Sequence, residues 1–290
     1  MTAYTDEDVG NIVLLEHVNV QISDQALATL FYVVGLGFTR DPYLNVGLNN
    51  MWVNAGEQQF HLPTRTPQVI DGHIGLVVPD LGALETRLTA VQEGLGGTRF
   101  AWRRSGDTIS ATCPWGNEYR CYEAGAGFGD MGVGIPYVEF SVARGAAAAI
   151  VKFYDQFLGA GGSLESGDGA VVGRVNLGRH QYLNFRETDR ALRPYDGHHI
   201  AIYVSNFSRP YGLLKERGLI SEEVRNHQFR FKDIVDGDEG APVFALEHEV
   251  RSLHHPMFGR FFVNRDPLQS QRGYRRGRDA QVPYRNGEMA

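Results

Sequence analysis

The residues best suited to chemistry in this chain are those that begin a repeated eight-residue stretch. "HVNVQISD" begins at His17, "HIGLVVPD" at His73 and "HIAIYVSN" at His199. A weaker version, "EFSVARGA", begins at Glu139, where glutamate stands in place of histidine. Imidazole and carboxylate groups bind first-row divalent metals, and histidine also transfers protons near neutral pH. The four leading residues therefore predict a metal or acid–base site, provided that the fold brings them together.

Each stretch alternates apolar and polar residues, which is the period of a β-strand with two different faces. In the first copy the alternation ends at Asp24, a residue type that often caps a helix N-terminus. Apolar residues then recur at helical spacing as far as the "GLGF" sequence at 35–38. Three short strand-like segments follow, the last being "QQFHLP" at 58–63. The pattern predicts a unit of one strand, one helix and three further strands.

The chain contains this unit four times. A shift of 122 residues aligns identical residues of the two halves, among them Phe31 with Phe153, Tyr32 with Tyr154, Gly56 with Gly178 and Gln59 with Gln181. The leading residues also recur within each half, which gives four units of about 60 residues. One unit cannot bury both its helix and its sheet. We therefore expect an α+β fold in which four βαβββ units pair into two cupped, partly closed β-barrels.

A Gly-rich run at 124–136 separates the two halves and is typical of a linker. We expect one domain of two units at 1–132, a second domain of two units at 133–265, and a polar basic tail at 266–290. Because the net charge is −6, we expect neither a nucleic acid nor a membrane as partner. The N-terminus lacks the features of a secretory signal, and no apolar run reaches the roughly 18 residues of a membrane span. A cytoplasmic location is the expectation.

Several stretches resemble the vicinal oxygen chelate superfamily, which includes glyoxalases, bleomycin- and fosfomycin-resistance proteins, epimerases and type I extradiol dioxygenases. They are "LEHVNV" at 15–20, "FYVVGLGF" at 31–38, "GHIGLVVPDL" at 72–81, "PWGNEYRCYE" at 114–123, "KFYDQFLGA" at 152–160, "GHHIAIYVSNF" at 197–207 and "ALEHEV" at 245–250. The resemblance covers about residues 13–250. With two halves of paired units, the chain looks most like the extradiol dioxygenases. That resemblance implies a divalent metal, with Fe²⁺ expected and Mn²⁺ or Zn²⁺ as alternatives.

In the family, ligands come from the first and last strands of each unit. For the first half the resemblance implies a set of four positions, which are His17, His61, His73 and Arg120. A guanidinium does not lose its proton at ordinary pH and cannot be a ligand. Arg120 could instead hold a substrate carboxylate or a developing oxyanion beside the metal. Glu118, two residues earlier on the same face, is the alternative ligand.

For the second half the resemblance implies Glu139, a residue at 183–184, His199 and Glu247. Glu249 points to the same face as Glu247 and could serve in its place. His227, in "NHQFRF", is the candidate for acid–base catalysis, because we expect it on a strand next to these ligands.

The resemblance leads to a metal-dependent enzyme that cleaves a catechol-like ring, with a small-molecule substrate that chelates the metal through neighbouring oxygens. A lyase or isomerase of the glyoxalase or epimerase kind is the second hypothesis. A metal-free protein that binds a small molecule, of the resistance type, is the third. Whether identical chains assemble into a homo-oligomer is left open.

Overall fold

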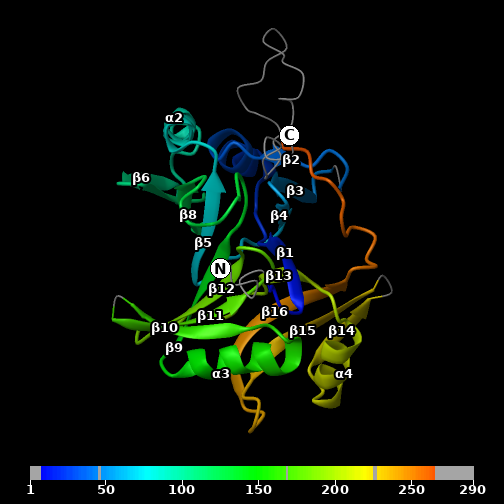
Figure 1. The fold of residues 1–290 in the computed structure, drawn as a ribbon. Helices are drawn as coiled ribbons and strands as arrows, with labels where there is room; N and C mark the ends of the chain where they lie inside the picture. Colours follow the sequence, from blue (N-terminus) through cyan, green and yellow to red (C-terminus); the bar gives the residue numbers. More distant parts are fainter. Residues whose placement is uncertain (1–7, 45–46, 168, 225–226, 265–290) are drawn as a thin grey trace, which may run out of the picture. The chain divides into compact units, whose positions relative to one another are not determined.

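The computed structural model describes residues 8–44, 47–167, 169–224 and 227–264. Within these ranges the chain forms four successive βαβββ units (Figure 1). The strands are β1 Ile12–Asn19, β2 Thr39–Arg40, β3 Asn50–Ala55, β4 Gln58–Pro63, β5 Gly72–Val78, β6 Ala101–Ser105, β7 Thr108–Thr112, β8 Glu118–Glu123, β9 Tyr137–Ala143, β10 Gly162–Gly167, β11 Ala170–Asn176, β12 Tyr182–Thr188, β13 His199–Val204, β14 Ile220–Val224, β15 Gln228–Val235 and β16 Pro242–Ser252. The helices are α1 Gln25–Ala28, η2 Thr29–Gly35, α2 Leu81–Val91, α3 Ala146–Phe153, η3 Tyr154–Leu158 and α4 Ser208–Glu216. The predicted α+β class and four-unit plan are confirmed.

The strands form two sheets of eight. The order in the first sheet is β14-β15-β16-β13-β1-β4-β3-β2, and the order in the second is β10-β11-β12-β9-β5-β8-β7-β6. Each sheet therefore takes one βαβββ unit from each half of the chain. Among the described residues, no helix is long and apolar enough to cross a membrane. The tail at 266–290 lies outside the described residues.

The repeated eight-residue stretch is a strand followed by a helix cap. Asp24 accepts hydrogen bonds from the backbone N–H groups of Ala26 and Leu27, at 2.6 and 3.0 Å. Asp80, at the end of the second copy, accepts one from the N–H of Ala83 at 2.5 Å. These carboxylates bind backbone donors that have no partner within the helix. The cap predicted at Asp24 is confirmed.

In every βαβββ unit the first strand pairs in parallel with the last strand, and the register is the same each time. We define two register positions on this strand pair, both on the same face because side chains alternate along a strand. The first position pairs the leading residue with the last strand: His17–Gln59, His73–Glu118, Glu139–Asn184 and His199–Glu247. The second lies two residues further: Asn19–His61, Gly75–Arg120, Ser141–Arg186 and Ala201–Glu249.

The contacts divide the chain into two compact units. The N unit contains His17–Pro136 with Phe261–Ala290, and the C unit contains Met1–Glu16 with Tyr137–Arg260. Strand β1 therefore contributes to both, because its residues up to Glu16 count with the C unit.

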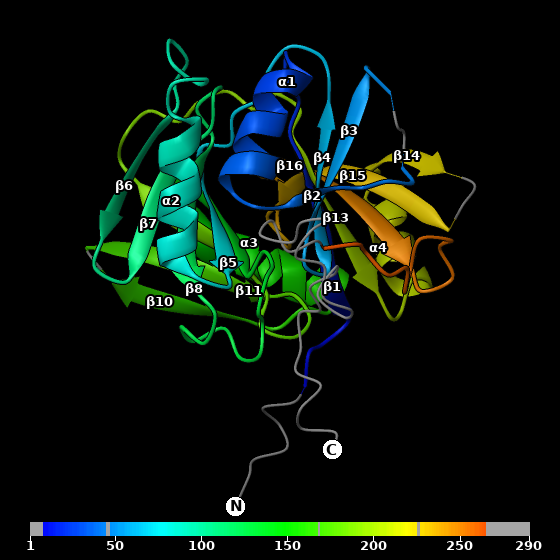
Figure 2. The ribbon, with the colours of Figure 1, turned by 90° about the horizontal axis from the view of Figure 1, so that it is seen from above.

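In the N unit the helices α1, η2 and α2 pack together, and α2 lies alongside β7 and β8 (Figure 2). Helix η2 continues α1 with a wider, π-helical turn, which places Tyr32 inside the core. The hydroxyl group of Tyr32 lies 2.6 Å from that of Tyr119 on β8. Burial raises the pKa of both phenols well above the usual range, so both stay neutral.

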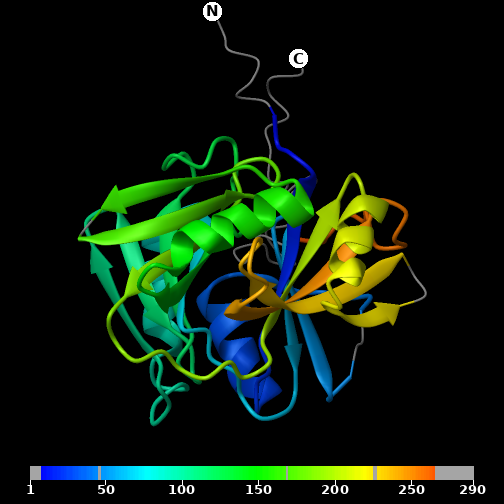
Figure 3. The same ribbon diagram turned by 90° about the horizontal axis from the view of Figure 1, so that it is seen from below.

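The C unit repeats this arrangement. Helix α3 packs on β10, β11 and β12 (Figure 3) and continues into the π-helical turn of η3. Tyr154, the counterpart of Tyr32 in the duplication, has its hydroxyl group 2.6 Å from Nε2 of His248 on β16. The ring of His248 stacks on Phe231, with centroids 4.3 Å apart. His248 pairs with Ile200 as Tyr119 pairs with Ile74, so the two buried bonds are equivalent.

The terminal segments of the chain are exchanged between the halves. Near the N-terminus, Asn11 donates a hydrogen bond to the carbonyl of Leu158 in the C unit, at 2.8 Å. Near the C-terminus, Asn264 is bonded to both backbone groups of Gly56 in the N unit, at 2.9 Å each. Each half therefore relies on a short segment from the far end of the chain.

Two glycines at duplicated turns are required by close backbone packing. Gly56 has φ +69°, and a Cβ there would lie 2.0 Å from the carbonyl oxygen of Val133. Gly178 has φ +60°, and a Cβ there would lie 2.1 Å from the carbonyl oxygen of Val13. No side chain fits at either distance, which explains why glycine stands at both positions.

Candidate metal centre

In the N unit, two of the predicted ligands lie side by side on neighbouring strands. His17 on β1 is fully buried, and its ring centroid is 5.7 Å from that of His61 on β4. Trp52 on β3 stacks on His61 at 3.9 Å with an interplanar angle of 10°, and its edge-on contact with His17 is 5.0 Å. The indole therefore fixes the orientation of one imidazole and contacts the other. Trp52 was not predicted, since its role depends on the pairing of β3 with β4.

The surroundings of this pair fit a polar ligand. Asn19, opposite His61 in the register, is 2% exposed, and its Oδ1 atom has no hydrogen-bond partner among the described residues. The same holds for Nε1 of Trp52, a residue that is 6% exposed. An unsatisfied buried polar atom costs about 1–3 kcal/mol, so such atoms usually mark a place where water, an ion or a ligand binds.

In the C unit, His199 lies at the start of β13 and faces two carboxylates. Its Nδ1 atom is 3.9 Å from Oε1 of Glu247, and its Nε2 atom is 3.8 Å from Oε2 of Glu249. Both carboxylates are bound by Arg230, whose two terminal nitrogens each donate a hydrogen bond of 2.5 Å. Glu247 is therefore beside His199 as predicted, but its charge is balanced by an arginine that sequence reasoning did not assign.

Arg230 is also paired with the exposed Glu222, and from Arg230 a row of alternating charges continues into the core. Glu249 also accepts a hydrogen bond of 2.6 Å from Nε of Arg251, and Arg251 is paired with Glu16. Burial raises the pKa of Glu16, although Arg251 opposes the rise. Burial opposes the charge on Arg251, but Glu16 and Glu249 outweigh it and raise its pKa. The row fixes the position of Glu249 next to His199.

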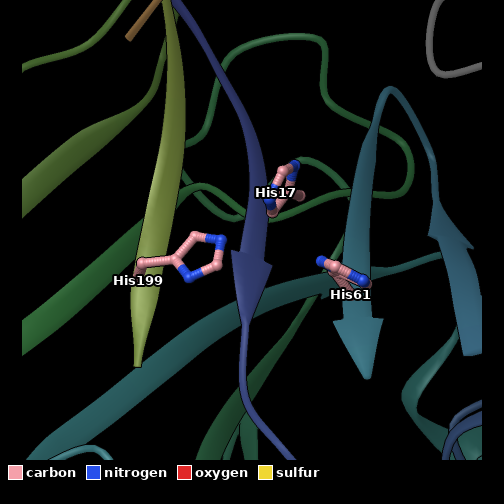
Figure 4. Close-up of side chains that lie close together, drawn as sticks. All are labelled: His17, His61 and His199. Atoms are coloured by element: carbon pink, nitrogen blue, oxygen red, sulfur yellow. The ribbon is translucent and has the colours of Figure 1, made fainter. Parts of the chain in front are cut away.

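Within the N unit, His17 and His61 offer ring nitrogens to one ion. They come from the neighbouring strands β1 and β4 (Figure 4), and one nitrogen of His17 lies within 4.8 Å of one nitrogen of His61. Within the C unit, His199 on β13 offers its ring nitrogens beside the carboxylates of Glu247 and Glu249. Each unit therefore presents donor groups that suit a divalent ion.

The sequence-based grouping of the ligands by halves stays a prediction. His17 and His73 both belong to the N unit, and Glu139 and His199 both belong to the C unit. In the strand order, β1 and β13 belong to the first sheet, whereas β5 and β9 belong to the second. The leading strands of one half therefore are not hydrogen-bonded to each other.

The remaining predicted ligands are placed as follows. Glu139 is paired with Arg186 at 2.9 Å, so its charge is balanced. His73 is buried and lies opposite Glu118 in the register. Arg120 is exposed and occupies the second register position, the one held by His61 in the first βαβββ unit. From the sequence, Arg120 and Glu247 are expected at equivalent positions of the two halves. By register, Arg120 corresponds to Glu249, and Glu118 corresponds to Glu247.

His227 does not lie on a strand, contrary to the prediction. It precedes β15 in a left-handed conformation with φ +57°, and its side chain is exposed. Its ring contacts that of His254 at 6.1 Å. The turn between β14 and β15 accounts for this, because the chain reverses direction there. Nothing in its surroundings assigns it to acid–base catalysis.

No family model matches the sequence, and no curated protein matches it either. Among solved structures, a protein from Bacillus subtilis subsp. subtilis str. 168 described as a "putative dioxygenase" matches with a TM-score of 0.55 and 14% identity, over 83% of this chain and 86% of that one. Glyoxalase I from Zea mays matches with a TM-score of 0.55 and 13% identity, over 81% of this chain and 91% of that one. The chain has the vicinal oxygen chelate fold. At these identities the likeness establishes the fold alone, which supports many chemistries.

Proposed function

We propose that the protein binds a divalent metal ion through His17 and His61, and that it acts on a small molecule that chelates the ion through two neighbouring oxygens. The side-by-side placement of the two imidazoles, next to the unsatisfied Oδ1 atom of Asn19, carries the proposal. The stacking of Trp52 on His61 supports it, because an oriented imidazole loses little freedom when it binds a metal. Fe²⁺ is the expected ion, with Mn²⁺ or Zn²⁺ as alternatives, since imidazole suits all three.

We favour ring cleavage of a catechol-like substrate, as in an extradiol dioxygenase. A bound ion would supply Lewis acidity and, if it is iron, a path for electrons between the diol and dioxygen. Neutral imidazole ligands would leave the charge of the ion uncompensated, which favours a substrate with two anionic oxygens. Arg230 holds both Glu247 and Glu249, so neither carboxylate is ready to take a proton from carbon. That arrangement favours a reaction that needs no carboxylate base.

A second candidate is an isomerase or lyase of the glyoxalase kind, and one observation favours it. Glu249 occupies the second register position, as His61 does in its own βαβββ unit, and it lies 3.8 Å from His199. If Arg230 released it, the carboxylate could act as a base. A third candidate is a metal-free binding protein, in which substitution of the histidines would leave ligand affinity unchanged.

The metal is tested first. Protein purified without oxygen and loaded with Fe²⁺, Mn²⁺ or Zn²⁺ should retain about one equivalent after desalting. His17→Ala and His61→Ala should each lose most of it. His254→Ala is the matched control, because His254 is exposed and does not belong to the pair. Retention by both variants, or no retention by the unaltered protein with any of these ions, would contradict the proposal.

The reaction is tested with the loaded protein. Oxygen uptake with a series of catechols, together with a yellow ring-opened product, is expected for a dioxygenase. Conversion of an α-hydroxycarbonyl compound without oxygen would identify the isomerase instead. An Arg230→Gln variant separates the two further, since freeing the carboxylates should assist the isomerase and should not assist ring cleavage.

A further inference from the structure

The second sheet has a polar face in the N unit that the proposed function does not use. On β8, Glu118, Arg120 and Tyr122 alternate with the buried residues Tyr119 and Cys121. Helix α2 packs on β7, β8 and η2 (Figure 2), and Tyr119 contacts Tyr32 of η2, so the buried residues of β8 face the helices. The alternating side chains of β8 therefore line the opposite face, together with those in register on β7 and β6.

The register places two arginines and a hydroxyl group in one row across this face. Arg120 on β8 lies opposite Ser110 on β7, and Ser110 lies opposite Arg103 on β6. Neighbouring strands are about 4.8 Å apart, so the two arginine backbones are separated by about 10 Å. Two arginine side chains, each about 6 Å long, can meet above the serine that lies between them.

Both guanidinium groups are available. Arg103 and Arg120 are exposed, and the structure gives neither an ion pair nor a hydrogen bond among the residues it describes. Glu118 is the carboxylate nearest along β8, and it is not paired with either of them. By contrast, Arg104, on the other face of β6, is paired with Glu85 at 2.9 Å.

The position of Arg120 carries a different side chain in two of the other βαβββ units. The second register position holds His61 and Glu249 in the two βαβββ units that form the first sheet, and Arg120 and Arg186 in the two that form the second. The first pair consists of groups that bind cations, and the second consists of groups that bind anions. Arg186 is balanced by Glu139, whereas Arg120 has no such partner in the described chain.

We propose that the row of Arg103, Ser110 and Arg120 is a binding site for one carboxylate or phosphate group of a small molecule. Two guanidinium groups donate to the oxyanion from either side, and the serine hydroxyl donates from below. The site needs no metal, and it includes neither His17 nor His61. The face is a site for an acidic ligand rather than only a solvated surface.

Titration of the full-length protein by nuclear magnetic resonance tests the proposal. Inorganic phosphate and benzoate are added in turn, with chloride adjusted to keep the ionic strength constant. The Nε–H signals of Arg103 and Arg120 and the amide of Ser110 should shift and saturate with at least one of the two anions. The anion that saturates identifies the class of ligand. Arg120→Gln and Arg103→Gln should each weaken binding by about tenfold or more.

Arg104→Gln is the matched control, since it removes an exposed arginine from the same strand but from the other face. It should bind as the unaltered protein does, and so should His61→Ala, which keeps this outcome independent of the metal proposal. The inference is overturned if neither anion gives a saturating shift, or if Arg104→Gln weakens binding as much as Arg120→Gln does.

Discussion

The buried histidine of the C unit makes a sharp prediction about stability and pH. His248 is fully buried, with Nε2 2.6 Å from the hydroxyl group of Tyr154 and Nδ1 2.7 Å from the carbonyl oxygen of Leu246. Burial lowers its pKa from 6.5 to about 3, and the bond to the carbonyl only partly opposes the change. The folded protein therefore keeps this ring neutral across a range in which the unfolded chain protonates it.

The sign follows from proton linkage. Between pH 6.5 and about pH 3 the unfolded chain binds one more proton at this residue, so stability falls as the pH falls. The loss from this one group is about 1.4 kcal/mol per pH unit and about 5 kcal/mol over the whole range. As the pH rises above 6.5 the slope from this group fades, because the unfolded chain loses the proton as well.

The perturbation is His248→Tyr, because Tyr119 fills the equivalent place in the N unit and stays neutral. Urea unfolding, followed by circular dichroism from about pH 7 to about pH 4, gives the free energy of unfolding at each pH. As the pH falls, the free energy of unfolding of the unaltered protein should decrease more steeply than that of the variant, by about 1.4 kcal/mol per pH unit. His248→Gln repeats the test with a smaller neutral side chain. His254→Gln, at an exposed histidine, should keep the original slope. Parallel pH profiles for the unaltered protein and both His248 variants would refute the reasoning.

Three further predictions concern buried charge, backbone packing and the stacked indole. Arg251→Gln should lower the free energy of unfolding in urea by about 3–5 kcal/mol, because it leaves a buried carboxylate without its counter-charge. Arg144→Gln, from a pair exposed by about two thirds, should lower it by less than about 1 kcal/mol. Gly56→Ala should lower the free energy of unfolding by well over the roughly 1–2 kcal/mol that a left-handed conformation alone costs. Gly106→Ala, where a Cβ would meet nothing within 4 Å, should lower it only by the cost of the conformation. Equal melting curves for the two variants would contradict the packing argument. Trp52→Ala should weaken metal binding about 10–100-fold in a chelator competition, and an unchanged affinity would remove the indole from the site.

Local features of the fold were predictable because they depend on neighbours in sequence. The alternation after His17 gives a strand, and the carboxylate of Asp24 gives the helix start that follows it. The duplication gives the number of βαβββ units without any knowledge of their contacts. His61 could be found as well, because it belongs to the same βαβββ unit as His17.

The partnership between βαβββ units could not be predicted from the same pattern. The edge of β1 that accepts β13 has an alternation that would suit β5 equally well, since both leading strands are copies of one another. The pairing register along a strand could not be predicted either, because a period of two identifies the face on which a residue lies and not the residue with which it pairs. Arg120 and Glu118 share a face, and so do Glu247 and Glu249, so the choice between them needed the register.

The exchange of terminal segments constrains how this protein can be divided. A gene cut within the Gly-rich run would encode two pieces that match the duplication, yet each piece would be incomplete. The later piece would lack Glu16, the buried counter-charge of Arg251, and the earlier one would lack Asn264, which holds the Gly56 turn. Neither fragment should be stable by itself, whereas the two produced together should reassemble. The two halves therefore depend on being joined in one chain, because each needs a terminal segment that the other half carries.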